Sequence, residues 1–148
     1  MVLSQTKYKL PDDLKMQCIS IVRGYDRRKD EYHKKREAII YGSTKPSDGQ
    51  PKGNMTGNPT YDKVIKLEMI ENDIDTKLMR SVEQSRIQIG VDIISETERQ
   101  RLTDAIWDSC IYGRNFIFEY QPLSMGKTCF YKHRRKFLFD IAKNIGYI

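Results

Sequence analysis

The stretch from residue 41 to residue 60 constrains the fold more than any other part of the chain. It contains seven residues that interrupt regular structure: Gly42, Pro46, Gly49, Pro51, Gly53, Gly57 and Pro59. Glycine is costly in a helix because it loses much conformational freedom there, and proline removes a backbone N–H and clashes with the preceding turn. We therefore expect a flexible loop over residues 41–59, with regular structure on either side of it.

The segment before this loop has the pattern of one long amphipathic helix. Pro11 and the two acidic residues after it suit a first helical turn, since that position needs no N–H and acids complement the helix dipole. Apolar residues then recur at helical spacing: Leu14, Cys18, Ile21, Val22, Tyr25 and Tyr32. The pattern predicts a single helix from residue 11 to about residue 40. Its second half alternates in charge sign, which indicates a solvated face or, as an alternative, a DNA-contacting face.

A second helical pattern follows the loop. Asn58 and Pro59 can cap and open a helix. The apolar positions of this helix are Val64, Leu67, Ile74, Leu78 and Val82. We expect it to end near Gly90 and to pair antiparallel with the first helix, so that residues 1–90 form a long helical hairpin. Apolar surface left over on these helices would serve either core packing or self-association.

The rest of the chain, residues 91–148, is also predicted to be helical. Ser95 and Glu98 match a capping box, which starts a third helix that ends at Gly113. Residues 115–120 fit a short helix, although their aromatic and β-branched content would also suit a strand. A final helix is expected to begin after Gly126, or after Ser124, and to end at Gly146.

Charge distinguishes this last helix from the rest of the chain. The formal net charge is +6, and residues 122–148 hold six basic residues and one acidic residue. Such clustering is the electrostatic pattern of a nucleic-acid-binding segment, although a solvated basic helix would show it too. At about 100° per residue, the predicted packing face consists of Phe130, Phe137, Leu138, Ile141 and Ile145. Arg134 falls within this face and needs a carboxylate or a route to solvent, whereas Phe139 falls among the basic residues.

A short element, a turn at Pro122 and a helix with a basic face match a helix-turn-helix, whose second helix enters the major groove of DNA. Residues near the start of that helix would reach base edges: Lys127, Thr128, Tyr131 and Lys132. Residues further along would hold phosphates: Arg135, Lys136 and Lys143. The predicted fold class is all-α, with an N-terminal long helical hairpin plus a C-terminal helix-turn-helix over residues 91–148.

The sequence gives little support for nucleotide binding, metal binding or catalysis. The run Gly126-Lys127-Thr128 could end a phosphate-binding loop, but that motif requires a glycine where Gln121 stands. His33 and His133 lie in basic runs without metal-ligand spacing. The three cysteines, Cys18, Cys110 and Cys129, form no Cys-x-x-Cys pair and suit reduced thiols in the cytoplasm. We therefore expect no catalytic residue, no metal and no cofactor.

The residues of the last helix also resemble a known family. The sequence FYKHRRKFLFDIAKNIG, residues 130–146, is similar to the C-terminal end of the RinA/ArpU-type late-gene transcription regulators of Gram-positive phages. The sequence LPDDLKMQCISIVRGYDRRKDEY, residues 10–32, also resembles phage proteins of this kind. In that family the turn before Phe-Tyr is usually richer in serine and threonine than residues 125–129 are here. The resemblance implies a DNA-recognition helix and, because the family is distantly similar to sigma factors, a contact with RNA polymerase.

Together these patterns predict a cytoplasmic, sequence-selective double-stranded DNA-binding protein that acts as a phage transcription regulator in the bacterial host. Homo-oligomers are compatible with this role. No run of about 18 apolar residues predicts a membrane span. One alternative is a DNA-packaging component like a small terminase subunit, and another is a protein–protein adaptor whose basic helix meets an acidic partner.

Overall fold

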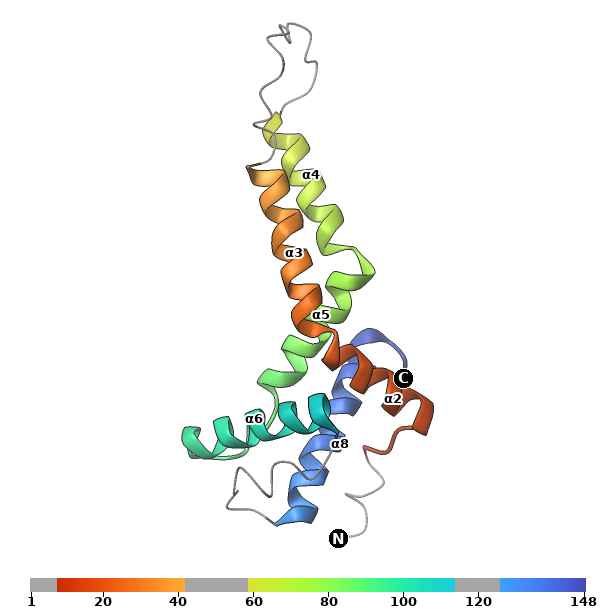
Figure 1. Ribbon diagram of the computed structural model, residues 1–148, viewed down its shortest axis with the longest axis vertical. Helices are drawn as coiled ribbons and strands as arrows, with labels where there is room; N and C mark the ends of the chain where they lie inside the picture. Colours follow the sequence, from red (N-terminus) through yellow and green to blue (C-terminus); the bar gives the residue numbers. More distant parts are fainter. Residues whose placement is uncertain (1–7, 42–58, 114–125) are drawn as a thin grey trace, which may run out of the picture. The chain divides into compact units, whose positions relative to one another are not determined.

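The computed structural model describes residues 8–41, 59–113 and 126–148, and their regular structure is entirely helical (Figure 1). The helices are α2 (Asp12–Arg23), α3 (Tyr25–Ile40), α4 (Pro59–Glu71), α5 (Ile74–Ile87), α6 (Glu96–Tyr112) and α8 (Lys127–Ile145). The predicted all-α class is confirmed over these residues. None of these helices has the length and apolar content that a membrane span requires. The short element expected over residues 115–120 and the turn at Pro122 lie outside the described residues.

The single helix expected over residues 11–40 is instead two helices that meet at Gly24. The Gly24 N–H still donates to the Ser20 carbonyl at 3.0 Å, but its ψ is 1°, about 40° from the helical value. Glycine in a helix interior costs about 1 kcal/mol relative to alanine. The prediction of one continuous helix was therefore wrong, because the apolar pattern continues past a residue at which the backbone turns.

The helix expected from Pro59 to near Gly90 is likewise two helices, separated by Asn72 and Asp73. The Asp73 N–H bonds to the Ile70 carbonyl at 3.1 Å, and the Asp73 carbonyl accepts the Lys77 N–H at 3.0 Å as the first bond of α5. Asparagine and aspartate favour helix ends because their side chains compete for backbone hydrogen bonds. The break between α4 and α5 therefore has a local cause that the apolar periodicity concealed.

The chain folds into two compact units. Unit 1 comprises residues 1–25 and 78–148, and unit 2 comprises residues 26–77. The sequence predicted a different division, with one boundary between residues 1–90 and residues 91–148. The difference arises because α2 packs against α6 and α8, which lie far along the chain from it.

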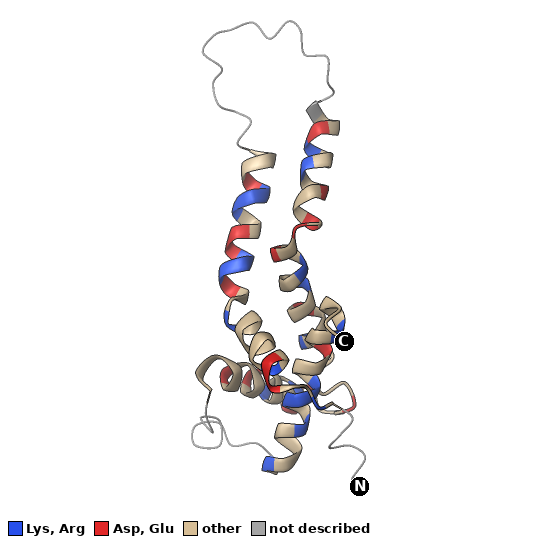
Figure 2. Cartoon of the chain, turned by 90° about the vertical axis from the view of Figure 1, so that its right-hand side faces the viewer, with Lys and Arg blue, Asp and Glu red and all other residues tan. Residues whose placement is uncertain are grey.

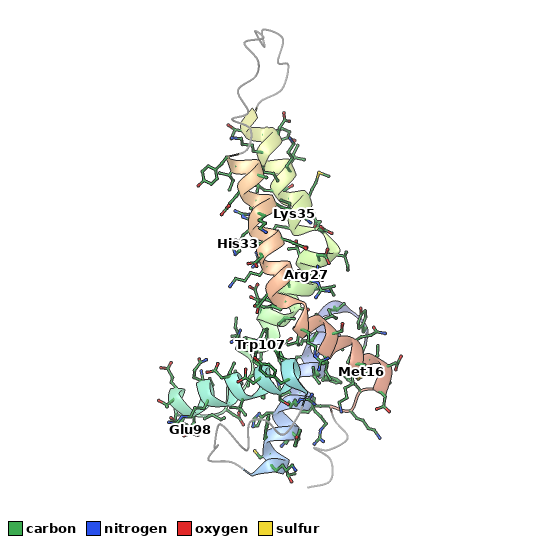
Figure 3. All side chains as sticks on the ribbon, viewed as in Figure 1. Met16, Arg27, His33, Lys35, Glu98 and Trp107 are labelled. Carbon is green, nitrogen blue, oxygen red and sulfur yellow. The ribbon has the colours of Figure 1, made fainter. Side chains whose placement is uncertain are left out.

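Unit 1 has a core of fully buried side chains from α2, α5, α6 and α8. They are Cys18, Val22, Met79, Val82, Leu102, Ile106, Cys110, Phe130, Phe137, Leu138 and Ile141. The ends of α6 are those predicted: the Ser95 hydroxyl accepts the Glu98 N–H at 3.4 Å, and Gly113 follows in the left-handed conformation. The ring of Trp107, which belongs to α6 (Figure 3), has its centroid 4.4 Å from the Arg86 guanidinium.

In unit 2, α3 runs antiparallel to α4. Lys63 near the start of α4 donates to the Ile40 carbonyl at the end of α3, with a separation of 3.4 Å. The buried Tyr32 hydroxyl donates to Glu71, and Lys35 pairs with Asp73 at 3.3 Å. Figure 2 shows basic and acidic residues alternating along α3.

Candidate nucleic-acid interface

The candidate interface is built on α8, whose ends and packing face agree with the sequence prediction. Gly126 is the N-cap residue, in an extended conformation. Gly146 ends the helix in the left-handed conformation, where the N–H of Gly146 and the N–H of Tyr147 bond back to the carbonyls of Lys143 and Ala142. This is a Schellman motif, which satisfies carbonyls that the helix end leaves unpaired. Phe130, Phe137, Leu138 and Ile141 are buried as predicted, and Ala142 joins them, whereas Ile145 is half-buried.

A groove of about 690 Å³ lies between the first half of α8 and the segment that leads into α2. The α8 wall consists of Lys127, Thr128, Tyr131, Arg135 and Leu138. The opposite wall consists of Tyr8, Lys9, Leu10, Asp12 and Lys15. Four of the predicted DNA-contacting residues are thus brought together in one groove. Its lining has four cationic side chains and one carboxylate, so the groove favours an anionic ligand.

Tyr8 connects the second wall to the basic side of α8. Its ring meets the Phe139 ring edge to face, with centroids 5.4 Å apart. The Lys136 ammonium lies 6.0 Å from the Tyr8 ring centroid, at the outer limit of a cation–π contact. Tyr8, Lys9 and Lys15 were not predicted as site residues, but the sequence did contain a signal. Phe139 is an aromatic residue among basic residues of α8, and such a side chain is expected to pack against another apolar group. Tyr8 is that group.

The other three predicted residues lie outside the groove. Lys132 and Lys143 are exposed, and Lys136 forms an i,i+4 ion pair with Asp140 at 2.7 Å. At about 100° per residue these three share one strip of α8, next to the strip that faces the groove. The positive charge of α8 is therefore divided between a groove and an open strip, and the Lys136 charge on that strip is partly neutralised.

Arg134 lies against a cysteine. Its Nε atom is buried without a hydrogen-bond partner among the described residues, and its guanidinium neighbours the Cys110 thiol. Arg23 donates from Nε to the Cys110 carbonyl at 3.0 Å. Both arginines thus lie near the C-terminal end of α6, where the helix dipole favours positive charge.

Burial controls the reactivity of the two core thiols. It raises the pKa of Cys110 even though Arg134 and Arg23 act in the opposite direction. Burial, followed by the neighbouring Cys110, raises the pKa of Cys18 to about 11. Both thiols are therefore protonated at neutral pH and are poor nucleophiles.

His133 is not the solvated or DNA-facing side chain that its basic neighbours indicated. It is half-buried beside Gln88, Ile89 and Gly90, in the turn that follows α5. Burial is the main cause that lowers the pKa of His133, and Lys132 and Lys136 lower it further, while Asp92 opposes them. The lowered pKa favours the neutral imidazole at pH 7.

Comparison with known proteins gave no match: no family model fits the sequence, and no curated protein and no solved structure is significantly similar to it. Within residues 8–41, 59–113 and 126–148, no three His, Cys, Asp or Glu side chains gather closely enough to hold a metal ion. The candidate functional site consists of the groove and the open basic strip of α8.

Proposed function

We propose that this protein binds double-stranded DNA through α8, selects a DNA sequence and regulates phage transcription. The observation that carries the proposal is the groove, in which Lys9, Lys15, Lys127 and Arg135 gather from two separate segments of the chain. If α8 were only a solvated basic helix, there would be no reason for a second segment of the chain to place further cations beside it. A groove of this composition suits a phosphate backbone, the ligand that dominates the affinity of DNA-binding proteins.

The start of α8 is suited to contact with bases. Lys127, Thr128 and Lys132 are exposed, and Gly126 before them has no side chain that would cover the helix end. The N-terminal end of a helix carries partial positive charge and is attracted to the DNA backbone. We propose that this end enters the major groove, with α8 as the second helix of a helix-turn-helix, and that the groove cations hold the adjoining phosphates.

The regulatory part of the proposal rests on the resemblance of residues 130–146 and 10–32 to phage late-gene regulators. A contact with RNA polymerase and self-association belong to that role. A packaging component would also bind DNA, but without sequence preference and within a large ring. An adaptor would bind an acidic protein and no DNA.

The decisive experiment is selection of bound sequences from a random double-stranded DNA pool, followed by titration of the recovered sequence and a scrambled one. We expect a consensus sequence. Lys127→Ala and Lys15→Ala should each weaken binding about fivefold, equivalent to ~1 kcal/mol. Lys132→Ala should cost about 1–3 kcal/mol of discrimination between the two sequences if Lys132 reads a base.

Lys77→Ala is the matched control, because it removes one exposed lysine from α5, outside the groove lining and outside the charge-alternating half of α3, and changes the net charge equally. It should leave the affinity within about twofold of the parent protein. Binding without any enriched sequence would favour the packaging role. An absence of DNA affinity at low salt would leave the adaptor role and refute the proposal.

A further inference from the structure

Helix α4 carries apolar side chains on two opposite sides. Toward α3 it presents Ile70, which is 8% exposed, and Leu67, which is half-buried. On the other side Tyr61 is 62% exposed, Ile65 is 38% exposed and Met69 is 67% exposed. Residues four apart share one face of a helix, so these three side chains form a continuous strip. Val64, which is 48% exposed, borders the strip.

A second apolar side is unusual for a helix of a soluble protein. Such helices normally present one apolar face to their core and a polar face to water, because exposed apolar surface is unfavourable in water. A single exposed apolar residue is common and needs no cause. Bulky residues in a continuous strip, on the side away from the packing face, indicate instead a surface that a partner covers.

We propose that the partner is a second copy of this chain, and that the two α4 helices pack antiparallel about a two-fold axis beside Ile65. A two-fold interface is self-complementary, because the same patch is used on both copies. An axis beside Ile65 places the two Ile65 side chains together and sets Tyr61 of each copy opposite the partner's Met69. A large and a flexible side chain thus meet at each end of the strip.

The charges beside the strip select this arrangement. Asp62 and Lys66 are both exposed, lie on the same flank of α4 and form no ion pair among the described residues. Antiparallel pairing places Asp62 of each copy on the same flank as the partner's Lys66, with an offset of about 3 Å along the helix, which the lysine side chain can span to form two equivalent ion pairs. Parallel pairing about a two-fold axis would set this flank against the opposite flank of the partner, where Glu68 lies, so Asp62 of one copy would not meet Lys66 of the other.

The strip also predicts how strong the association is. Stable protein interfaces bury roughly 1,200–2,000 Å², whereas one helix pair with four apolar side chains per copy is smaller. We therefore expect a weak dimer with a dissociation constant on the order of micromolar. The strip belongs to unit 2 and the groove to unit 1, so the pairing can be tested without DNA.

The test is sedimentation equilibrium of the full chain at concentrations from about 1 to about 200 µM, which bracket the expected dissociation constant. The expected result is a monomer–dimer equilibrium. Ile65→Asp should weaken the association at least ~tenfold, because it buries an unpaired charge at the axis. The matched control is Met16→Asp in α2, which changes a methionine that is 63% exposed (Figure 3) and should leave the association unchanged.

Charge reversal tests the antiparallel geometry and leaves the apolar strip intact. Asp62→Lys and Lys66→Asp should each weaken the dimer by roughly tenfold, because each variant replaces two attractions with two repulsions. The double variant Asp62→Lys/Lys66→Asp should restore the parent dissociation constant. Single variants that weaken the dimer without restoration in the double variant would overturn the antiparallel arrangement.

Two further results would overturn the proposal. One is a strict monomer over the whole concentration range. If the protein is a monomer and Ile65→Asp lowers its Tm, the strip is covered by another part of the same chain. If the protein is a monomer and its Tm does not change, the strip faces solvent or binds a different protein. The other is a dimer that Ile65→Asp leaves intact, which would place the interface elsewhere on the molecule.

Discussion

Two glycines of unit 1 end helices in the same backbone conformation but in different surroundings. Gly113, at the end of α6, has a φ of 71°, and Gly146, at the end of α8, has a φ of 95°. A Cβ atom added at residue 113 would lie 3.1 Å from Nη2 of Arg23. A Cβ atom added at residue 146 would meet no atom within 4 Å. The contact at residue 113 matters because Arg23 donates to the Cys110 carbonyl.

We predict that Gly113→Ala destabilises unit 1 more than Gly146→Ala does. Both substitutions incur the strain of a left-handed alanine, about 1–2 kcal/mol. Gly113→Ala also displaces the Arg23 guanidinium and so weakens its hydrogen bond, worth about 1.5–3 kcal/mol for a charged donor. The measurement is chemical denaturation of both variants in the parent protein and in an Arg23→Ala background. The difference between the variants should largely disappear without Arg23, and equal costs in the parent protein would contradict the prediction.

At the scale of single elements, α8 was predictable and helices α2 to α5 were only partly so. The limits and buried face of α8 follow from the two flanking glycines and from the spacing of Phe130, Phe137 and Ile141, all of which are local. The breaks at Gly24 and at Asn72–Asp73 were missed because the apolar pattern is continuous across them. Each break carries a local signal, a glycine or an Asn-Asp pair, that should outweigh an unbroken apolar pattern.

The candidate interface was predictable on one wall only. The α8 wall could be derived because helical spacing places Lys127, Tyr131 and Arg135 on one side. The wall with Tyr8 and Lys15 depends on packing between segments more than 100 residues apart, which no periodicity describes. The exposure of His133 was also misjudged, because the turn that covers it comes from the end of α5.

The packing of α8 against that turn makes stability depend on pH. Burial of His133 lowers its pKa in the folded state, so the unfolded chain takes up the proton first as the pH falls. This contribution to stability is therefore complete above about pH 7.5 and is lost as the pH falls through the unfolded value of about 6.5 toward the lower folded value. Asp92 moderates the effect, and Lys132 and Lys136 strengthen it.

We expect His133→Gln to make the free energy of unfolding less dependent on pH between about pH 5 and pH 8. Chemical denaturation across this range measures the effect. His33→Gln is the control, because it also removes one histidine, but from an exposed position on α3. A His133→Gln profile that parallels the parent profile would show that burial of His133 is not linked to folding.

At the scale of the whole molecule, the excess positive charge belongs to the unit that contains the groove. Residues 26–77 contain 11 basic and 10 acidic residues, and the rest of the chain contains 15 basic and 10 acidic residues. Unit 1 therefore carries five of the six net positive charges. Unit 2 is almost neutral, which suits the proposed pairing of α4 with a second copy of the chain.

The proposed role of the groove predicts how DNA affinity depends on salt. If Lys9, Lys15, Lys127 and Arg135 all contact phosphates, each contributes about 0.9 to the slope of log affinity against log salt, or roughly 3–4 together. Fluorescence anisotropy at several salt concentrations measures the slope. Lys15→Ala should lower it by about 1, and an affinity that does not change with salt would be incompatible with phosphate contacts in the groove.

The wall that Tyr8, Lys9 and Lys15 contribute to the groove also determines how the protein should be handled. A purification tag fused ahead of residue 1 would be tethered within eight residues of Tyr8, at the edge of the groove. If the groove binds DNA as proposed, an acidic epitope tag there would compete for the same cations and imitate a loss-of-function variant. At the other end Ile148 is 51% exposed, and the surroundings of Gly146 are open. Tags and fluorophores for binding assays therefore belong at the carboxyl end.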